Sequence, residues 1–235
     1  MCGRYVPPDE AALERFWQVD RRNWEGWVQP LFNIAPTSRV PIIIQDDDGC
    51  YESRGARWGL IPHWWKKDTP PALTFNARSE EAAQKPTWRS SLKSQRCLMP
   101  ARGWYEWNEK EKLRNTNGRL VKQPYFFYSE ASPVIAFAGL WAIKSDEGSA
   151  DIVSCALLSK EAAATVSHLH HRMPVVLREE DFAAWLDPET SEEEVESIIA
   201  RAREDFVAYR VSTDVNNTRN DYPELLDKVA SSNLF

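Results

Sequence analysis

Predicted strands follow one another through the middle of the chain with no predicted helix between them. Short apolar and aromatic runs bounded by turn residues predict these strands, which cover residues 96–99, 103–107, 125–128, 134–141 and 152–157. Parallel pairing would need a long crossover, usually a helix, between consecutive strands. A regular βαβ sheet is therefore excluded. The chain is expected to adopt an α+β fold in which a largely antiparallel sheet curls on itself in a barrel-like form.

A few helices are expected to flank this sheet. Apolar spacing and start signals predict them at residues 11–19, 79–84, 160–167, 179–186 and from about 191 to 203. The last of these begins with a capping box, because a Glu follows Thr190 or Ser191 three positions later. Further strands are predicted at residues 40–45, 51–58, 174–177 and 206–211. The length and the lack of a linker favour a single domain over residues 1–235.

The composition is that of a packed protein. Hydrophobic residues make up 43% and charged residues 27% of the chain. No apolar run reaches the roughly 18 residues of a membrane helix, and the first residues lack the apolar core of a signal peptide. A soluble intracellular protein is expected, cytoplasmic and nucleoid-associated in a bacterium or nuclear in a eukaryote. The four cysteines show no CxxC spacing, so free thiols are expected.

Charge is unevenly distributed along the chain. The net charge of −6, taken alone, argues against nucleic-acid binding. Residues 52–122, however, hold 15 Lys and Arg against 7 Asp and Glu, whereas residues 178–205 hold 3 against 11. The two segments form either two solvated surfaces without a partner or a basic face set apart from an acidic one. The 11 tryptophans, such as the adjacent Trp64 and Trp65, suit core packing and also the stacking of single-stranded bases.

The second residue carries the most specific chemistry. Initiator methionine is commonly removed before a small residue, and removal of Met1 would make Cys2 the first residue. Cys2 would then present an α-amine of pKa about 8 and a thiol of pKa about 8.5 on adjacent carbons. An aldehyde can form a Schiff base with this amine. The thiol can then close a five-membered thiazolidine ring in an intramolecular, and therefore favoured, step.

Three other segments hold residues suited to catalysis. Asn76 can bind a backbone group and Arg78 can clamp a phosphate, although a turn with a helix cap explains them equally well. Glu106 stands between two tryptophans, where apolar neighbours would raise the pKa of its carboxyl group and suit it to general acid–base catalysis. An edge-strand Glu that faces water fits the same pattern. His170 is suited to proton transfer, and which of His170 and His171 faces the site stays open.

Metal binding is a weaker interpretation of the histidines. Three of the four lie within residues 168–171, but no second ligand cluster is visible in the sequence. No metal and no cofactor is therefore expected.

Six short motifs occur in the order and rough spacing of the SOS response-associated peptidase (SRAP) family, whose members are abasic-site processing proteins. They are residues 1–5 (MCGRY), 32–37 (FNIAPT), 58–62 (WGLIP), 76–80 (NARSE), 103–107 (GWYEW) and 170–174 (HHRMP). Residues 211–216 also resemble the C-terminal segment of that family. The chain is thus similar to SRAP proteins over nearly its whole length.

The resemblance implies a reaction and its catalytic residues. Family members remove their own Met1, link Cys2 covalently to the ring-opened sugar of an abasic site in single-stranded DNA, and can act as lyases at that site. By motif position, Asn76 would hold the Cys2 backbone and the sugar. Glu106 would act as the general acid–base, and His170 would assist the Schiff-base chemistry.

The resemblance also implies a DNA-binding surface. Arg4 and Arg78 would grip phosphates beside the lesion. Pro36, Trp64 and Trp65 would form an apolar wedge against the bases. One departure from the family pattern is His171, which stands where an acidic residue is common.

Three functions remain open at this point. The first is a covalent sensor of abasic sites that is also a weak lyase, and that acts as a monomer because one strand needs one site. The second is an N-terminal-nucleophile amidohydrolase or thiol peptidase, in which Cys2 attacks a carbonyl of a non-DNA substrate. The third is a non-enzymatic reader of damaged DNA that does not need Cys2. The basic middle segment and the paired tryptophans favour the first over the second.

Overall fold

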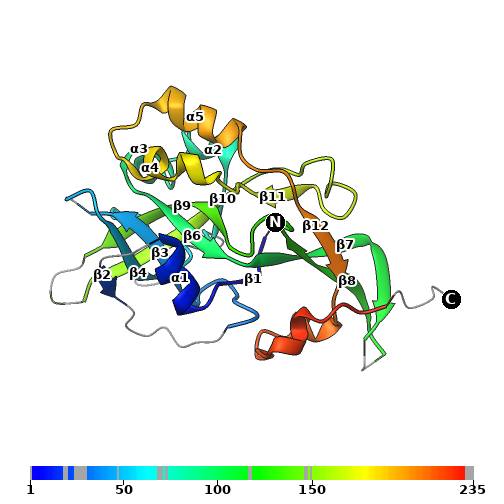
Figure 1. The fold of residues 1–235 in the computed structure, drawn as a ribbon. Coiled ribbons are helices and arrows are strands. Elements are labelled where there is room, and N and C mark those ends of the chain that lie inside the picture. Colours follow the sequence, from blue (N-terminus) through cyan, green and yellow to red (C-terminus); the bar gives the residue numbers. More distant parts are fainter. Residues whose placement is uncertain are drawn as a thin grey trace.

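Two mostly antiparallel sheets and a few short helices build the protein (Figure 1). The structure is a computed structural model that describes residues 2–17, 21–23, 31–46, 48–67, 71, 74–115, 118–145, 148 and 150–230. The expected α+β class with a curled, largely antiparallel sheet is confirmed. No helix among the described residues is long and apolar enough to cross a membrane.

The larger sheet has the strand order β11-β10-β9-β6-β3-β4-β2, and β5 pairs with β10 beside it. Its strands are β2 (Arg21–Asn23), β3 (Arg39–Gln45), β4 (Tyr51–Trp58), β5 (Asn76–Arg78), β6 (Arg96–Ala101), β9 (Ile135–Lys144), β10 (Ile152–Glu161) and β11 (Arg172–Pro174). The smaller sheet has the order β1-β7-β8-β12. Its strands are β1 (Tyr5–Val6), β7 (Gly103–Arg114), β8 (Leu120–Tyr128) and β12 (Val207–Arg210).

Five strands of the larger sheet close into a hydrogen-bonded ring. β10 pairs antiparallel with β9 and, at Ser154 and Cys155, parallel with β4. From β4 the ring returns through β3 and β6 to β9. Because only two residue pairs join β10 to β4, the ring is not a complete barrel. Side chains that alternate along these strands, among them Ile42, Trp58 and Phe137, pack together in its interior.

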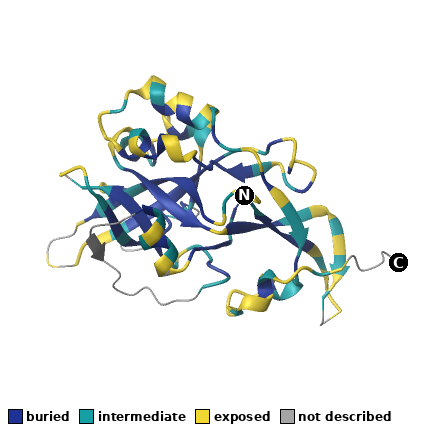
Figure 2. Ribbon diagram, viewed as in Figure 1, coloured by how far each residue is buried: buried dark blue, intermediate teal, exposed yellow. Residues whose placement is uncertain are grey.

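Helices cover the outer side of the ring. They are α1 (Glu10–Trp17), α2 (Ser79–Ala82), α3 (Arg89–Ser94), α4 (Phe182–Leu186) and α5 (Glu192–Ala200), with the 3-10 turn η1 (Glu179–Asp181) before α4. Two further 3-10 turns, η2 (Thr213–Asn216) and η3 (Pro223–Leu226), pack against the smaller sheet. Trp185 of α4 is fully buried, and its indole N–H donates to the Cys97 carbonyl at 3.0 Å. Figure 2 shows the buried strands between this exposed helical layer and the partly exposed smaller sheet.

Most strand predictions are confirmed, but the strand predicted at residues 174–177 is found at Arg172–Pro174 as β11, and one predicted helix is wrong. Residues 160–167 do not form a helix. β10 continues to Glu161 because β11 pairs with it as far as Glu161↔Arg172, and turns follow. The helix predicted for 179–186 is divided into η1 and α4. Propensity favoured a helix in residues 160–167, but Lys160 and Glu161 pair with β11 and the residues after them lead into turns.

The predicted cap of the last helix is confirmed. The Ser191 hydroxyl accepts the backbone N–H of Glu194 at 3.2 Å, and α5 ends at Ala200. Strand β5 and helix α3 were not predicted. The expected free thiols are observed, since none of the four cysteines forms a disulfide.

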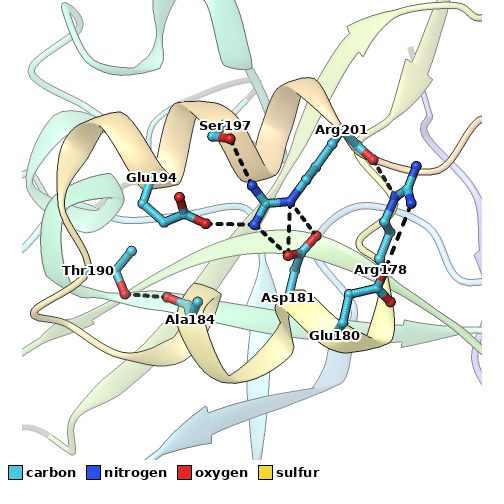
Figure 3. A network of polar contacts seen from close by, with 8 residues as sticks. All are labelled: Arg178, Glu180, Asp181, Ala184, Thr190, Glu194, Ser197 and Arg201. Carbon is cyan, nitrogen blue, oxygen red and sulfur yellow. Dashed lines mark hydrogen bonds and ion pairs between the residues drawn. The ribbon is translucent and has the colours of Figure 1, made fainter.

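The acidic late segment forms ion pairs within itself (Figure 3). Arg201 binds the buried Asp181 and also Glu194, each at 2.6 Å. Arg203 binds Asp205 at 2.7 Å, and Lys160 of β10 binds Glu204 at 2.6 Å. These contacts place much of the negative charge in the layer of α4 and α5, and basic side chains within that layer neutralise part of it.

A methyl group at Gly103 is expected to destabilise the protein. A Cβ there would collide with the Phe127 carbonyl oxygen and lie 2.5 Å from Phe126 Cζ. Because the β8 backbone cannot give way as a flexible side chain does, β7 and β8 would have to separate. We expect Gly103→Ala to lower the free energy of unfolding in urea by roughly 2–3 kcal/mol.

Gly118→Ala is the control. Its φ of +72° strains an alanine, but its Cβ would meet nothing within 4 Å, so the loss should stay near 1 kcal/mol. Equal losses in the two variants would contradict the close approach of β7 and β8.

Candidate active site

Cys2 is held beside the short strand β1, and its side chain is buried, with 1% exposed. β1 pairs with β7 through Tyr5↔Trp104 and Val6↔Gly103. Tyr5 also exchanges two backbone hydrogen bonds with Ile34, at 3.2 and 3.0 Å. The N-terminal segment is therefore fastened from both sides, and residue 2 lies against the interior cluster of the ring.

Asn76 connects this segment to the ring. It stands on β5, which pairs in parallel with β10 through Asn76↔Leu157. Its Nδ2 donates to the Cys2 carbonyl at 2.6 Å. Its Oδ1 is buried and has no hydrogen-bond partner within the described part of the chain. A buried acceptor of this kind is costly unless a ligand satisfies it, so Asn76 both holds Cys2 and offers an acceptor to a substrate.

Glu106 is a buried carboxyl group on β7, with 3% of its surface exposed. Burial raises its pKa to about 7, because a desolvated carboxylate is unstable. Burial, followed by the charge of Glu106, also raises the pKa of the Cys2 thiol well above its usual value. The Cys2 thiol is therefore protonated at neutral pH, while Glu106 is present in both its acid and its base form.

His170 faces Glu106 from the turn before β11. Its Nε2 lies 3.7 Å from Glu106 Oε2, and its Nδ1 lies 3.0 Å from both the backbone N and the carbonyl oxygen of Arg172, which hold the ring in place. Burial lowers the His170 pKa to about 4, so the imidazole is neutral at pH 7. His171 is exposed and stacks on His170 at 4.6 Å. His170, and not His171, is thus the ring that faces Glu106.

These four side chains give the site proton donors and acceptors around a thiol. Glu106 can donate or accept a proton near pH 7, and neutral His170 can accept one. No group of three potential metal ligands occurs in the described ranges. The arrangement suits nucleophilic attack by residue 2 with proton transfer through a buried carboxyl group.

The two arginines expected to contact phosphates have different surroundings. Arg4 is half-buried, and its Nη1 donates to Asn33 Oδ1 at 2.9 Å and to the Val215 carbonyl at 2.8 Å. Arg78, on β5 with Asn76, is exposed and pairs only loosely with Glu81 at 3.2 Å. Arg78 therefore has a guanidinium that a phosphate can reach, whereas Arg4 is largely engaged within the protein.

The three residues expected to form an apolar wedge lie near the start of β3 and in the loop after β4. Pro36 is half-buried and precedes Thr37, whose N–H donates to the Trp58 carbonyl at 2.7 Å. The loop after Trp58 carries Trp64, which is 44% exposed, and its ring lies 6.1 Å from that of Trp65. An exposed indole of this size is a surface on which a base can stack.

Two functional candidates were not singled out from the sequence. Arg172 binds both carboxylate oxygens of Glu80, at 2.7 and 2.9 Å, and its backbone positions His170. Asn33 binds Arg4, as described above. Both residues lie within the family-like motifs, but buried hydrogen-bond partners are not visible in a sequence.

Comparisons with known proteins agree on one family. The sequence profile of the SOS response associated peptidase (SRAP) family matches residues 1–218. The abasic site processing protein YoqW of Bacillus subtilis is 32% identical over 232 residues, which cover 97% of this chain and 99% of YoqW. The abasic site processing protein HMCES of Gallus gallus is 31% identical over 96% of this chain and 77% of its own length. A crystal structure from Bacteroides thetaiotaomicron has a TM-score of 0.78, with 23% identity, 97% of this chain and 99% of that chain covered, and shows the same fold.

Replacement of Glu106 by Gln is expected to change how stability depends on pH. The pKa of the Glu106 carboxyl group is higher in the folded protein than in the unfolded chain. The folded protein therefore loses stability as the pH rises from 4.5, the ordinary pKa of this group, to about 7. This interval corresponds to roughly 3 kcal/mol, and Gln does not titrate. The unfolding free energy of Glu106→Gln relative to wild type should therefore rise between pH 4.5 and 7 and stay constant above that range.

Urea unfolding at a series of pH values measures this difference. Glu109→Gln is the matched control, since Glu109 is exposed and its hydrogen bond with Lys122 lowers its pKa. No rise is expected in that control. A flat difference for Glu106→Gln would show that Glu106 titrates like a surface carboxyl group.

Proposed function

The chain belongs to the SOS response associated peptidase family, and from this premise we propose that it captures abasic sites in single-stranded DNA as a covalent thiazolidine link to Cys2. The observation that carries the proposal is the convergence of Cys2, Asn76, Glu106 and His170 from four separate segments. The names of the relatives support the processing of abasic sites as the general function.

The first step exposes the nucleophile. Hydrolysis of the Met1–Cys2 peptide bond consumes one water, releases methionine and leaves an α-amine on Cys2. Asn76 holds the Cys2 carbonyl, so Cys2 with its new amine would stay in the site after the cleavage. We propose that the protein catalyses this cleavage itself.

The second step forms the link. The neutral amine adds to the aldehyde carbon of the ring-opened sugar, and one water leaves to give an imine. The thiol sulfur then bonds to the imine carbon, and its proton passes to the imine nitrogen. Glu106 in its acid form protonates the departing hydroxyl, and in its base form it takes the thiol proton. Its pKa of about 7 makes both forms available at neutral pH.

Strand cleavage competes with ring closure. While the imine persists, loss of the proton on the neighbouring sugar carbon expels the phosphate on the 3′ side by β-elimination. Neutral His170, whose Nε2 lies 3.7 Å from Glu106 Oε2, is proposed to accept this proton. Rapid thiazolidine closure removes the imine, so lyase activity is expected to be weak.

The proposed partner is a single strand that lies across the site. Arg78 would bind a phosphate, whereas the Arg4 guanidinium is engaged by Asn33 and Val215. The exposed Trp64, with Trp65 and Pro36, would stack against bases. One site serves one strand, so we propose a monomer that works where DNA is located, in the nucleoid or the nucleus.

Covalent capture can be tested on a denaturing gel. Protein shown by mass to lack Met1 is mixed with a single-stranded oligonucleotide that carries one abasic site. A band shifted by the mass of the protein is expected for wild type and not for Cys2→Ala, which should still bind the same oligonucleotide under native conditions. A form whose N-terminus keeps an extension should not crosslink, because its amide nitrogen cannot form an imine.

Each failure has a distinct meaning. Crosslinking by the extended form would rule out the thiazolidine. If wild type without Met1 gives no shifted band but hydrolyses a small amide, the N-terminal-nucleophile amidohydrolase becomes the function.

The role of Glu106 predicts a second kinetic result. Glu106→Gln should crosslink at least about 10²-fold more slowly than wild type at pH 7, since a general acid–base is lost. Single-turnover gels measure the rate, and Glu109→Gln should match wild type. An unchanged rate in Glu106→Gln would remove Glu106 from the mechanism.

A further inference from the structure

One buried carboxamide joins three distant parts of the chain. Asn33, with 5% exposed, uses its Nδ2 to reach the carbonyls of Val215, Asn217 and Asn220 at 3.2, 3.1 and 2.9 Å. Its Oδ1 accepts a hydrogen bond from Arg4 Nη1 at 2.9 Å. The side chain thus connects the N-terminal segment with the turn of residues 213–220, here called the C-terminal turn.

The C-terminal turn is itself well ordered. Val215 is fully buried in the cluster that also holds Val6 and Tyr105. The Ser212 hydroxyl accepts the Asp214 N–H at 3.2 Å, and Asn220 Nδ2 donates to the Asp214 carbonyl at 2.8 Å. These bonds turn the carbonyls of the segment toward Asn33, where a fixed set of acceptors surrounds one donor group.

The same turn reaches residue 2 through Arg4. Arg4 Nη1 donates to the Val215 carbonyl at 2.8 Å as well as to Asn33. The Arg4 carbonyl accepts the Tyr105 N–H at 2.9 Å and lies 3.7 Å from the Cys2 thiol, which donates to it. Arg4 is therefore held at its side chain by the C-terminal turn and at its backbone by β7 and Cys2.

The turn also contacts the strand that carries Glu106. Trp107, the next residue on β7, donates from its Nε1 to Asn216 Oδ1 at 2.5 Å. The Arg4 guanidinium lies over the Trp107 ring, 5.9 Å from its centroid. A single segment near the end of the chain thus touches both the nucleophile's segment and the strand of the acid–base.

We infer that Asn33 is a positioning residue, which acts through Arg4 and the C-terminal turn to set where Cys2 lies relative to Glu106. The inference deepens the proposed function and rests on it. Attack on a bound aldehyde requires close alignment of the reacting atoms, and a small displacement of the nucleophile costs rate even when binding is intact. Loss of Asn33 should therefore slow the chemical step and leave DNA affinity unchanged.

The test separates chemistry from binding and from stability. Single-turnover crosslinking is measured over a range of protein concentrations for wild type, Asn33→Ala and Leu225→Ala. Leu225 is fully buried in the same cluster, so its truncation weakens the packing there without touching Arg4. Urea unfolding gives the free energy of unfolding of both variants. The crosslinking assays are then run under conditions in which both variants are folded.

Asn33→Ala is expected to lower the saturating crosslinking rate about 10- to 100-fold, with the half-saturating concentration within a factor of about two. Leu225→Ala should keep the wild-type rate. Arg4→Gln should slow the same step, and the double variant should be no slower than the slower single variant, because the two residues act as a unit. Rates that merely follow stability, or a wild-type rate in Asn33→Ala, would overturn the inference.

A DNA-free measurement keeps this test independent of the proposed function. Thiazolidine formation between Cys2 and a small aldehyde such as propanal is followed by mass spectrometry. Slower reaction in Asn33→Ala than in Leu225→Ala supports positioning even if wild type fails to crosslink DNA. Equal rates of the two variants contradict it.

Discussion

The fastening of the N-terminal segment into the core is the constraint on which the site depends. The first residues of a chain usually fray, and β1 pairs over only two residues. Packing compensates for this short pairing, because the fully buried Tyr5 ring meets Trp58 at 5.3 Å and Phe137 at 5.8 Å in edge-on contacts. The proposed nucleophile Cys2 lies near the end of the chain, and it is held in the site because its neighbours are core residues.

The burial of two ionisable groups, Glu106 and His170, has an energetic cost. A carboxyl group with a pKa near 7 and an imidazole with a pKa near 4 are both shifted by burial in the direction that disfavours charge. At neutral pH His170 is therefore uncharged and Glu106 is only partly ionised, so the pair can exchange protons readily. The folded protein is less stable for burying these groups, but both the acid and the base form of the Glu106 carboxyl group are then present. Such a loss of stability is common at functional sites.

The sequence predicted the residue types of the site better than their geometry. The strand-rich middle, the Ser191 cap and the motif residues Cys2, Asn76 and Glu106 follow from local patterns that tertiary structure preserves. The helix predicted at residues 160–167 is wrong, because Lys160 and Glu161 pair with β11 and the alanine-rich run after them leads into turns. The sequence did not reveal that Asn33 connects distant segments. Its partners at residues 215–220 are about 180 positions away, and they are backbone carbonyls, which any sequence contains.

The acidic isoelectric point is compatible with a DNA partner for a local reason. Carboxylates of the late segment are engaged by Arg201 in the helical layer (Figure 3), and also by Arg203 and by Lys160 of β10. Exposed charges farther than about 10 Å are largely screened in 0.1 M salt. A bound strand would meet the surface around the site, where Arg78 and Trp64 are exposed. Lys66 and Lys67 are exposed beside the paired tryptophans, and the Lys67 ammonium lies 5.5 Å from the centroid of the Trp65 ring. Cations and stacking surfaces thus lie next to each other, so phosphate contacts there would release counterions on binding whatever the net charge of the whole chain.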